Sequence, residues 1–263
     1  MTAQPLLEAR GVTKHFGGVA AVQAVDMQIA AGEMVGLIGP NGAGKTTFIN
    51  LITGMEPLTS GSIRFRGRDL AGVGMYRIGQ MGIARTFQVV KPFRNLSVRE
   101  NVAVGAMFGA GGAKRSSRQS FARAEEVLSF VGMGDLLARR ADQLTVPDLK
   151  RLELAKALAM DPQLLLLDEV MAGLNSREIE DAMTLIRKVN ASGVTVLVIE
   201  HVMKAIVGLS SRVIVLDFGQ KIAEGSPSDV MRNPEVVKAY LGDKYAQRLA
   251  ARAPAPLPMG PDA

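Results

Sequence analysis

The alternation of apolar and polar positions predicts a small antiparallel sheet in the first part of the chain. From residue 6 to 38 short apolar runs alternate with glycine-rich turns, and in "GSIRFRGRDL" (61–70) Ile63 and Phe65 stand at strand spacing. One run, "MVGLIG" (34–39), is continuously apolar and ends in glycine. Such a run is typical of a strand that is buried on both faces.

Farther along the chain the pattern becomes helical and then mixed. Between about residues 90 and 157 apolar residues recur every three or four positions, as in "FARAEEVLSFV" (121–131) and "RLELAKALA" (151–159), which predicts a mostly helical insertion. Short β-rich runs with a helical segment near 177–191 follow and predict a parallel α/β core. These runs are "LLLLD" (164–168), "VTVLVIE" (194–200) and "RVIVLD" (212–217).

Two segments have the composition of a linker or a tail. Residues 109–120 are rich in glycine, serine and basic residues, and residues 246–263 are rich in proline and alanine, which predicts a disordered tail. With 48% hydrophobic residues, the rest of the chain is long enough to bury a substantial core. We therefore expect one folded unit over residues 1–245, with the helical segment of about 90–157 inserted into the α/β core.

The composition excludes several kinds of site. The chain has no cysteine, so it can form no disulfide, zinc–thiolate site or thiol nucleophile, and a reducing compartment is the simplest location. No segment reaches the roughly 18 apolar residues that a spanning helix needs, so we expect that the chain does not cross a membrane. The net charge of +6 is scattered along the sequence, so anionic lipid headgroups or nucleotide phosphates explain it as well as nucleic acid does.

A glycine-rich motif predicts a phosphate-binding loop, here called the P-loop. "GPNGAGKTT" (39–47) matches G-x-x-x-x-G-K-[ST] between an apolar strand and a helix that we expect to begin at Lys45. The glycines let backbone N–H groups face phosphate oxygens, while Lys45 would reach the β and γ phosphates and Thr46 would coordinate Mg²⁺. A glycine-rich turn with a chance lysine is the alternative, which this context disfavours. The residues of the P-loop are Gly39, Pro40, Asn41, Gly42, Ala43, Gly44, Lys45, Thr46 and Thr47.

Two carboxylates directly after a buried strand could complete a hydrolytic site. In "LLLLDE" the strand is followed by Asp168, which would hold Mg²⁺, and Glu169, which would orient or deprotonate the attacking water. A solvated strand end is the alternative. The acid pair favours hydrolysis over nucleotide binding alone.

Two further polar residues stand where apolar segments end. They are Gln88 in "RTFQ" and His201 in "VIEHVM". Taken alone, such a histidine is more often a packed or capping residue, and such a glutamine is usually a solvated loop residue. Their order and spacing relative to the P-loop favour a role in the same site.

The order of these motifs resembles that of the ATP-binding subunits of ABC transporters, over roughly residues 5–242. The resemblance implies an α/β fold, a P-loop NTPase (RecA-like) parallel core with an N-terminal antiparallel β subdomain and an inserted helical subdomain. It implies that Phe16 stacks on adenine, with core packing as the alternative. It also makes Gln88 a catalytic residue that senses the metal and the γ-phosphate, and His201 the switch histidine. ATP and Mg²⁺ are the implied cofactors.

Finer features are similar to the ATP-binding subunits of branched-chain amino acid importers. They are "KHFGGVAAV", "RTFQVVKPFRNLSVRENV", "RLELAKALAMDPQLLLLDEVMAGLN", "VIEHVM" and "NPEVVKAYLG". Because importers of urea, short amides and other small polar solutes have similar subunits, the solute rests on this resemblance alone.

The resemblance implies a peripheral ATPase on the cytoplasmic face of the inner (plasma) membrane. Its partners would be transmembrane permease subunits, a second ATP-binding subunit and, indirectly, a solute-binding protein, but not nucleic acid; a heterodimer is favoured and a homodimer is possible. "VVKPFRNL" (89–96) mixes apolar and basic residues, as a docking surface would. One alternative is a soluble ABC ATPase that acts on nucleic acid or ribosomes, which the single cassette disfavours. The other is a weakly hydrolytic regulatory module, which the acid pair disfavours.

The sequence departs from this family at three places. Val170 stands where proline is usual, and Asn175 stands where many members have aspartate. Residues 144–148, Leu-Thr-Val-Pro-Asp, replace the L-S-x-G-Q signature, whose N–H groups contact the γ-phosphate bound to the partner subunit. The signature turn of this chain consists of Thr145, Val146, Pro147 and Asp148.

The signature turn fits the capping-box pattern [ST]-x-x-[DE]. We expect the Thr145 hydroxyl to accept from the N–H of Asp148 and the Asp148 carboxylate to accept from the N–H of Thr145, with Pro147 tolerated in the first turn. Pro147 lacks an N–H and Asp148 adds negative charge, so we expect a weaker trans contact and an asymmetric heterodimer. In the alternative, Thr145 suffices and Lys150 or Arg151 offsets the charge.

Overall fold

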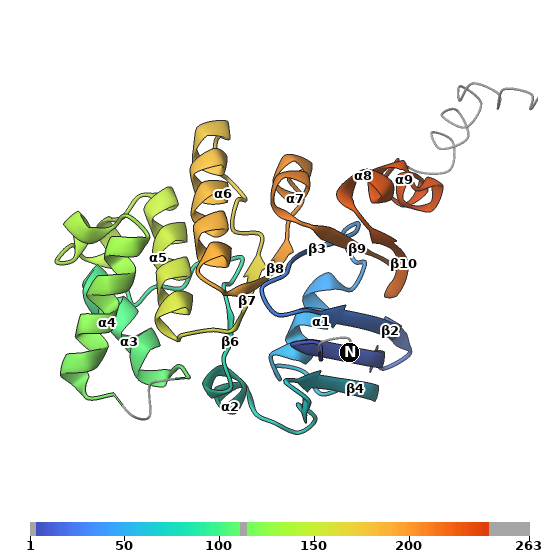
Figure 1. The fold of residues 1–263 in the computed structure, drawn as a ribbon, viewed down its shortest axis with the longest axis horizontal. Coiled ribbons are helices and arrows are strands. Elements are labelled where there is room, and N and C mark those ends of the chain that lie inside the picture. Colours follow the sequence, from blue (N-terminus) through green and yellow to red (C-terminus); the bar gives the residue numbers. More distant parts are fainter. Residues whose placement is uncertain (1–3, 111–114, 242–263) are drawn as a thin grey trace, which may run out of the picture.

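The structure, a computed structural model, describes residues 4–110 and 115–241 and places their strands in two sheets (Figure 1). The first is the predicted antiparallel sheet, with the strand order β2-β1-β4-β5. The predicted tail lies outside the described residues, as do residues 111–114 of the predicted linker. The strands of this sheet are β1 (Leu7–Phe16), β2 (Val19–Ile29), β4 (Ser60–Phe65) and β5 (Arg68–Asp69).

The second sheet contains the predicted parallel core. Its strand order is β10-β9-β3-β8-β7-β6, and neighbours run parallel except for β10, which pairs antiparallel with β9. The four predicted core strands are confirmed, whereas the three-residue β6 and the partly exposed edge strand β10 were not predicted. The strands are β3 (Met34–Ile38), β6 (Ile83–Arg85), β7 (Leu164–Asp168), β8 (Thr195–Ile199), β9 (Arg212–Asp217) and β10 (Gln220–Gly225).

Strand β7 shows why the core strands are continuously apolar in sequence. All of its residues are buried. Leu164 and Leu166 pack with the antiparallel sheet, whereas Leu165 and Leu167 pack with the helices on the opposite face. Burial of each leucine side chain stabilises the fold by roughly 1.5–3 kcal/mol, so both faces of the strand favour apolar residues.

Helices cover both faces of the parallel sheet. Helix α1 (Lys45–Ile52) lies between the two sheets, where Phe48 and Ile52 pack in the same cluster as the antiparallel strands. On the opposite face α6 and α7 pack against the strands (Figure 1). No helix within the described ranges is long and apolar enough to cross a membrane. The other bounds are α2 (Met75–Gln80), α6 (Ser176–Ala191), α7 (Met203–Leu209), α8 (Pro227–Arg232) and α9 (Pro234–Leu241).

The predicted helical insertion is confirmed. Its helices pack together at one end of the molecule (Figure 1). A Cβ on Gly105 would lie 2.4 Å from the carbonyl oxygen of Lys156, so glycine is required where α3 meets α5. The elements of the insertion are α3 (Val98–Phe108), α4 (Ser117–Phe130), two short 3-10 helices (Gly134–Leu136 and Ala141–Gln143) and α5 (Val146–Ala159).

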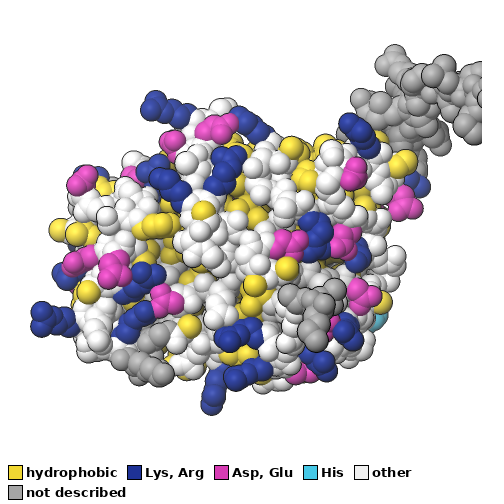
Figure 2. Space-filling view, viewed as in Figure 1, with side chains coloured by type: hydrophobic (Ala, Val, Ile, Leu, Met, Phe, Trp, Pro, Cys, Tyr) yellow, Lys and Arg dark blue, Asp and Glu magenta, His cyan; other side chains and the backbone are white. Residues whose placement is uncertain are grey.

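Charged side chains are dispersed over the face of the molecule shown in Figure 2. Lysine and arginine lie among aspartate and glutamate there, rather than in one basic stripe. This distribution agrees with the scattered charge of the sequence. A protein that binds nucleic acid usually gathers its basic residues on one face.

Candidate active site

The predicted phosphate-binding and catalytic residues lie at the carboxyl edge of the parallel sheet, whereas Phe16 ends a strand of the antiparallel sheet and the signature turn begins α5. The P-loop follows β3, Gln88 lies just beyond β6, Glu169 follows β7 and His201 lies just beyond β8. These strands are parallel neighbours in the order β3-β8-β7-β6, so their carboxyl ends lie side by side. In open α/β sheets this edge is the usual place for a ligand.

Glycines with positive φ shape the P-loop. A Cβ on Gly39 (φ 150°) would lie 2.1 Å from the carbonyl oxygen of Leu216, and one on Gly44 (φ 97°) would lie 2.4 Å from that of Ala21. A Cβ on Gly42 (φ 82°) would meet no atom within 4 Å. Gly39 and Gly44 therefore allow the loop to lie close to the neighbouring backbone, whereas the outer side of Gly42 is open.

Helix α1 begins at Lys45, as predicted, and its N-terminus has no side-chain cap. The N-cap residue is Gly44, and the first turn contains no acidic residue. Thr46, the predicted metal ligand, is exposed in this turn. Because the first N–H groups of a helix lack intrahelical acceptors and carry partial positive charge, this end can bind an anion.

The Lys45 ammonium is buried beneath the P-loop. The residue is 6% exposed, and its Nζ donates to the carbonyl oxygens of Gly39 at 2.7 Å and Pro40 at 2.9 Å. Burial lowers the pKa of Lys45, and the negative charges of Glu169 and Asp168 offset part of this effect. The ammonium therefore lies within the electrostatic field of both carboxylates.

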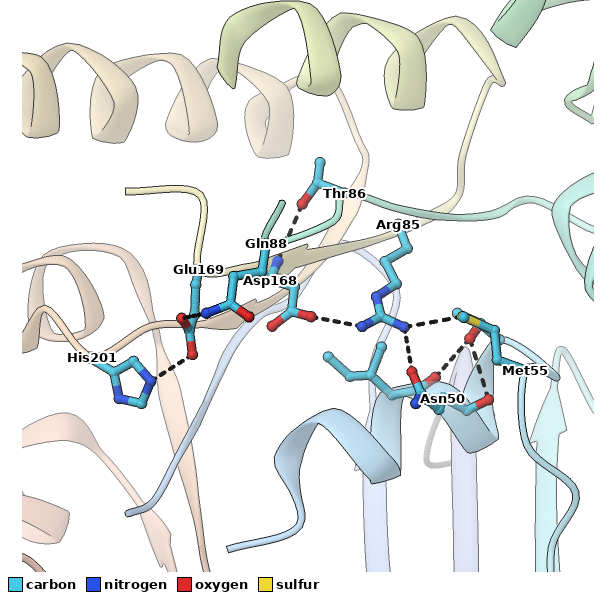
Figure 3. A network of polar contacts seen from close by, with 10 residues as sticks. Asn50, Met55, Arg85, Thr86, Gln88, Asp168, Glu169 and His201 are labelled. Atoms are coloured by element: carbon cyan, nitrogen blue, oxygen red, sulfur yellow. Dashed lines mark hydrogen bonds and ion pairs between the residues drawn. The ribbon is translucent and has the colours of Figure 1, made fainter. Parts of the chain in front are cut away.

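Glu169 lies between the other two predicted catalytic residues (Figure 3). Gln88 Nε2 donates to Glu169 Oε2 at 2.6 Å, and His201 Nε2 lies 2.5 Å from Glu169 Oε1. The backbone of Glu169 has φ 49°, which for a residue other than glycine costs about 1–3 kcal/mol. Its N–H donates to the carbonyl oxygen of Ile199 at 2.9 Å, which holds the turn against β8. The three side chains thus form one contiguous network.

Asp168 is held by an arginine that no sequence motif identified. Its side chain is 5% exposed, and Arg85 Nη2 donates to Asp168 Oδ2 at 2.7 Å (Figure 3). The backbone N–H of Asp168 also donates to the Thr86 hydroxyl at 3.2 Å. The end of β6 therefore fixes the end of β7.

Two further residues support the site in roles that the sequence did not indicate. Lys150 on α5 donates to the carbonyl oxygens of Gln88 at 3.3 Å and Glu169 at 3.4 Å. Glu200 is 2% exposed, and its carboxylate accepts from the N–H of Met171 at 2.8 Å. Burial raises the pKa of Glu200, while the N–H of Met171 acts in the opposite direction. An acid directly after the apolar run of β8 was the available signal for Glu200.

Phe16, which we expect to stack on adenine, is not part of the core. It ends β1 and is 45% exposed, and Lys14 Nζ lies 4.6 Å from the centroid of its ring. The alternative of core packing is therefore wrong. Stacking on adenine stays a prediction.

The two single-residue departures from the family pattern have local structural roles. Val170 is partly buried and packs against the core cluster that includes α5 and α6. Asn175 is the N-cap of α6, and its side-chain oxygen accepts from the N–H groups of Arg177 at 3.0 Å and Glu178 at 3.1 Å. An Asn at this position therefore starts the helix as an aspartate would.

The predicted reciprocal cap of the signature turn is half correct. The Thr145 hydroxyl accepts from the N–H of Asp148 at 3.3 Å, and Pro147 lies in the first turn, as predicted. The Asp148 carboxylate, however, accepts from the Thr145 hydroxyl at 2.7 Å instead of from the Thr145 N–H. In the complete capping box of α3, Glu100 does reach the N–H of Ser97. Aspartate is one methylene shorter, which accounts for the difference.

The oxygen-rich donors at this edge suit magnesium. Asp168 supplies a carboxylate, Thr46 a hydroxyl and Gln88 an amide oxygen, all of which are hard ligands. Within the described ranges no group of three or more His, Cys, Asp or Glu side chains could hold a metal by itself. Magnesium fits such a set because it is commonly bound by one or two carboxylates together with the phosphates of a substrate.

Comparison with family models identifies two matching regions. A model described as "ABC transporter" matches residues 22–172, and one described as "Branched-chain amino acid ATP-binding cassette transporter" matches residues 220–246. The curated relatives include the high-affinity branched-chain amino acid transport ATP-binding proteins LivG of Salmonella typhimurium and BraF of Pseudomonas aeruginosa. They are 38% and 37% identical to this chain over 253 residues, which cover 92% of the chain and 99% of each relative.

Solved structures with the same fold include cassettes in different states. A nucleotide-free ATP-binding cassette from an ABC transporter is 28% identical, with a TM-score of 0.82 over 91% of this chain and 100% of the other. A dimeric cassette in a post-hydrolysis state, bound to ADP and phosphate, is 27% identical, with a TM-score of 0.74 over 84% of this chain and 98% of the other.

Proposed function

This chain belongs to the ATP-binding proteins of ABC transporters, and from that premise we propose that it hydrolyses ATP to power a permease that imports branched-chain amino acids. The solute is supported by the names of LivG and BraF and by the second family model, which matches residues 220–246. A solute-binding protein would deliver the amino acid to the permease, as we expect from the resemblance.

The network around Glu169 is the observation that supports hydrolysis best. Both carboxylate oxygens have partners, Gln88 at one and His201 at the other, so the orientation of the carboxylate is fixed. A carboxylate held in this way can orient a water molecule for in-line attack and accept its proton. His201 can then stabilise negative charge as it develops. Phosphoryl transfer mainly requires that a protein hold the reacting groups in fixed positions.

The other residues of the edge would bind the nucleotide. The P-loop N–H groups and the N-terminus of α1 would bind the phosphates, and Lys45 would turn from the carbonyl oxygens of Gly39 and Pro40 toward the β and γ phosphates. Asp168, Thr46 and Gln88 would hold Mg²⁺, whose charge offsets that of the phosphates. Phe16 would stack on adenine, since an exposed aromatic face accepts any base.

An apolar groove beside the site is suited to an apolar segment of the permease. Methionines and an aromatic residue line it between α1, α2 and β6, namely Met55, Met75, Phe87 and Met160. Met75 is 53% exposed and Phe87 is 38% exposed, and exposed apolar residues that share one groove are typical of a surface that contacts a partner. Methionine adapts readily to the shape of a bound helix. The groove adjoins Gln88, so docking there would lie next to the catalytic network.

The loop at residues 89–96 extends this surface. Val89 is 67% exposed and Phe93 is 48% exposed, and Lys156 donates to the carbonyl oxygen of Lys91 at 3.3 Å. The loop therefore presents apolar side chains while α5 anchors its backbone. We place the permease contact here, with the chain bound peripherally to the cytoplasmic face of the inner membrane.

Members of this family dimerise, and we propose a heterodimer for this chain. In a closed dimer the signature turn of one subunit faces the P-loop of the other. The self-capped turn of this chain would complete the partner's site poorly, whereas a partner with an intact signature would complete the site on this P-loop.

Two substitutions test the proposed chemistry in different ways. Lys45→Ala should weaken nucleotide binding roughly ten- to hundredfold, because a charged hydrogen bond contributes about 1.5–3 kcal/mol. Glu169→Gln should retain binding, lower turnover by about 10²- to 10⁴-fold and trap the ATP-bound dimer. The assay is turnover and dimer formation with saturating Mg-ATP, with Lys221→Ala as a control outside the site. Equal turnover by Glu169→Gln and wild type would remove Glu169 from the catalytic role.

A further inference from the structure

Arg85 is a buried cation at the centre of the site that the proposed chemistry does not use. Its side chain is 8% exposed, and its two terminal nitrogens have different partners. Nη2 donates to Asp168 Oδ2 at 2.7 Å, and Nη1 donates to Asn50 Oδ1 at 2.6 Å (Figure 3). Its Nε is buried and has no hydrogen-bond partner among the described residues. Burying a charged group away from water is energetically unfavourable, so the position of this arginine in the site calls for an explanation.

The position of the guanidinium is fixed from several sides. Asn50 belongs to α1, the helix that begins at the P-loop, whereas Asp168 ends β7 and Arg85 itself ends β6. The Phe87 ring centroid lies 5.1 Å from the guanidinium carbon, and Met55 Sδ lies 3.5 Å from Nη1. The guanidinium therefore has little freedom to move away from Asp168.

We propose that Arg85 is a positioning residue for Asp168 as a magnesium ligand, which rests on the proposed function of Asp168. The hydrogen bond at Oδ2 fixes the rotation of the carboxylate, and no side chain within residues 4–110 and 115–241 donates to Oδ1. Oδ1 is thus the oxygen that the metal would take. Thr86 fixes the backbone of the same residue, so the carboxylate is held at both ends.

Two effects of the arginine on the metal have opposite signs. Its positive charge repels Mg²⁺, whereas its hydrogen bond holds the ligand in place. The charge already pairs with Asp168 in a buried contact, so we expect positioning to dominate. Removing an outer partner of a metal ligand typically lowers metal affinity 10- to 100-fold.

The test measures binding rather than turnover. The full-length chain is titrated with a fluorescent ATP analogue at a series of Mg²⁺ concentrations. The Mg²⁺ midpoint is the concentration that gives half of the metal-dependent gain in affinity for the analogue. Arg85→Met should raise the midpoint about tenfold or more and leave the affinity without Mg²⁺ within twofold of wild type. Arg85→Lys should have a Mg²⁺ midpoint between those of wild type and Arg85→Met. An ammonium keeps the charge but cannot reach Asn50 and Asp168 with a fixed planar fork.

Two controls separate positioning from a general structural role. Arg212→Met removes another partly buried arginine, which pairs with Glu33 and Glu224 away from the site. It should lower the melting temperature without moving the Mg²⁺ midpoint. Asn50→Ala removes the second anchor of Arg85 and should raise the midpoint less than Arg85→Met does. If Arg85→Met does not fold, Asn50→Ala and Arg85→Lys provide the test instead.

The outcomes distinguish this inference from the proposed function. A midpoint for Arg85→Met within twofold of wild type, or below it, would overturn the positioning role, and a lower midpoint would show that charge repulsion dominates. Asp168→Asn provides the separate check. If it leaves the midpoint unchanged, the proposed role of Asp168 itself fails; if it raises the midpoint while the Arg85 variants do not, the inference about Arg85 alone fails.

Discussion

Helices α1 and α5 begin in opposite ways, although the proposed mechanism places a phosphate at the N-terminus of each. Helix α1 follows Gly44, which has no side chain, and its first turn has no acidic residue. Helix α5 follows Thr145, whose hydroxyl accepts from the N–H of Asp148, and its first turn also contains Pro147. The N–H groups at the N-terminus of α1 are therefore available to an anion, whereas at the N-terminus of α5 the N–H of Asp148 already has an acceptor in the Thr145 hydroxyl.

This difference shows that helix capping and anion binding compete for the same N–H groups. A side-chain cap stabilises a helix by about 0.5–2 kcal/mol, but it occupies a donor that a phosphate would otherwise use. A carboxylate in the first turn also interacts favourably with the helix dipole and thereby opposes a second anion. We expect strong binding of phosphate at α1 within the subunit and a weak contact from α5 to the partner's nucleotide.

The largest expected effect is a loss of stability on substitution of the glycine that precedes α1. Gly44→Ala should destabilise the chain by roughly 2–5 kcal/mol, because the new Cβ would meet the carbonyl oxygen of Ala21 at 2.4 Å in a left-handed conformation. Gly42→Ala, which meets no atom within 4 Å, should cost only the strain of about 1–2 kcal/mol. Urea unfolding measures both. Equal losses would mean that close packing does not hold this end of the P-loop.

A smaller effect concerns the α5 end. Thr145→Ala should lower the free energy of unfolding by about 0.5–2 kcal/mol, since the N–H of Asp148 loses its acceptor. Thr145→Ser keeps the hydroxyl and serves as the control, with stability close to that of wild type. If the serine variant loses as much stability as the alanine variant, the cap does not stabilise α5.

The smallest expected effect is a change in how stability depends on pH, and it comes from the buried carboxylic acid Glu200. Burial raises the pKa of Glu200, so the folded chain keeps this proton to a higher pH than the unfolded chain does. The contribution of Glu200 to the stability of wild type should therefore fall as the pH rises from about the unfolded value of 4.5 through the folded pKa, and then level off.

Glu200→Gln removes this titration and can still accept from the N–H of Met171. The free energy of unfolding of the variant minus that of wild type should therefore increase over the same pH range. Thermal unfolding at several pH values measures it. A difference that is constant with pH, or that decreases as the pH rises, contradicts the raised pKa.

The sequence was most informative where local pattern alone determines structure. The strand 164–168 and the start of α1 at Lys45 were predicted to the residue, because an uninterrupted apolar run and a Gly-Lys junction have clear ends. Strand β6 was missed because three residues are too few for a period to show. Glu169 was found because it follows an apolar run, and Gln88 and His201 were found from their order relative to the P-loop. The network that joins these three side chains was not predicted.

Features that depend on distant partners could not be predicted. Arg85 and Asp168 are far apart in sequence, and their pairing follows from the adjacency of β6 and β7. The positive φ of Glu169 has no signature in its residue type. The signature turn was misjudged in one detail because [ST]-x-x-[DE] does not distinguish aspartate from glutamate. Ser226 with Asp229 shows the same hydroxyl-to-carboxylate bond as Thr145 with Asp148.

The most direct test of the central claim restores the usual signature at the α5 end. Pro147→Gly combined with Asp148→Gln returns a backbone N–H and removes a negative charge, while Thr145 remains as the cap. Steady-state ATP turnover is measured for the purified full-length chain with saturating Mg-ATP, with Val146→Gly as the matched control in the same turn. Because a regained hydrogen bond to a charged phosphate contributes about 1.5–3 kcal/mol, turnover should increase about tenfold or more, and Val146→Gly should match wild type. Equal turnover by wild type and the restored variant, at equal ATP affinity, would contradict the claim that Pro147 and Asp148 weaken the trans contact of the signature turn.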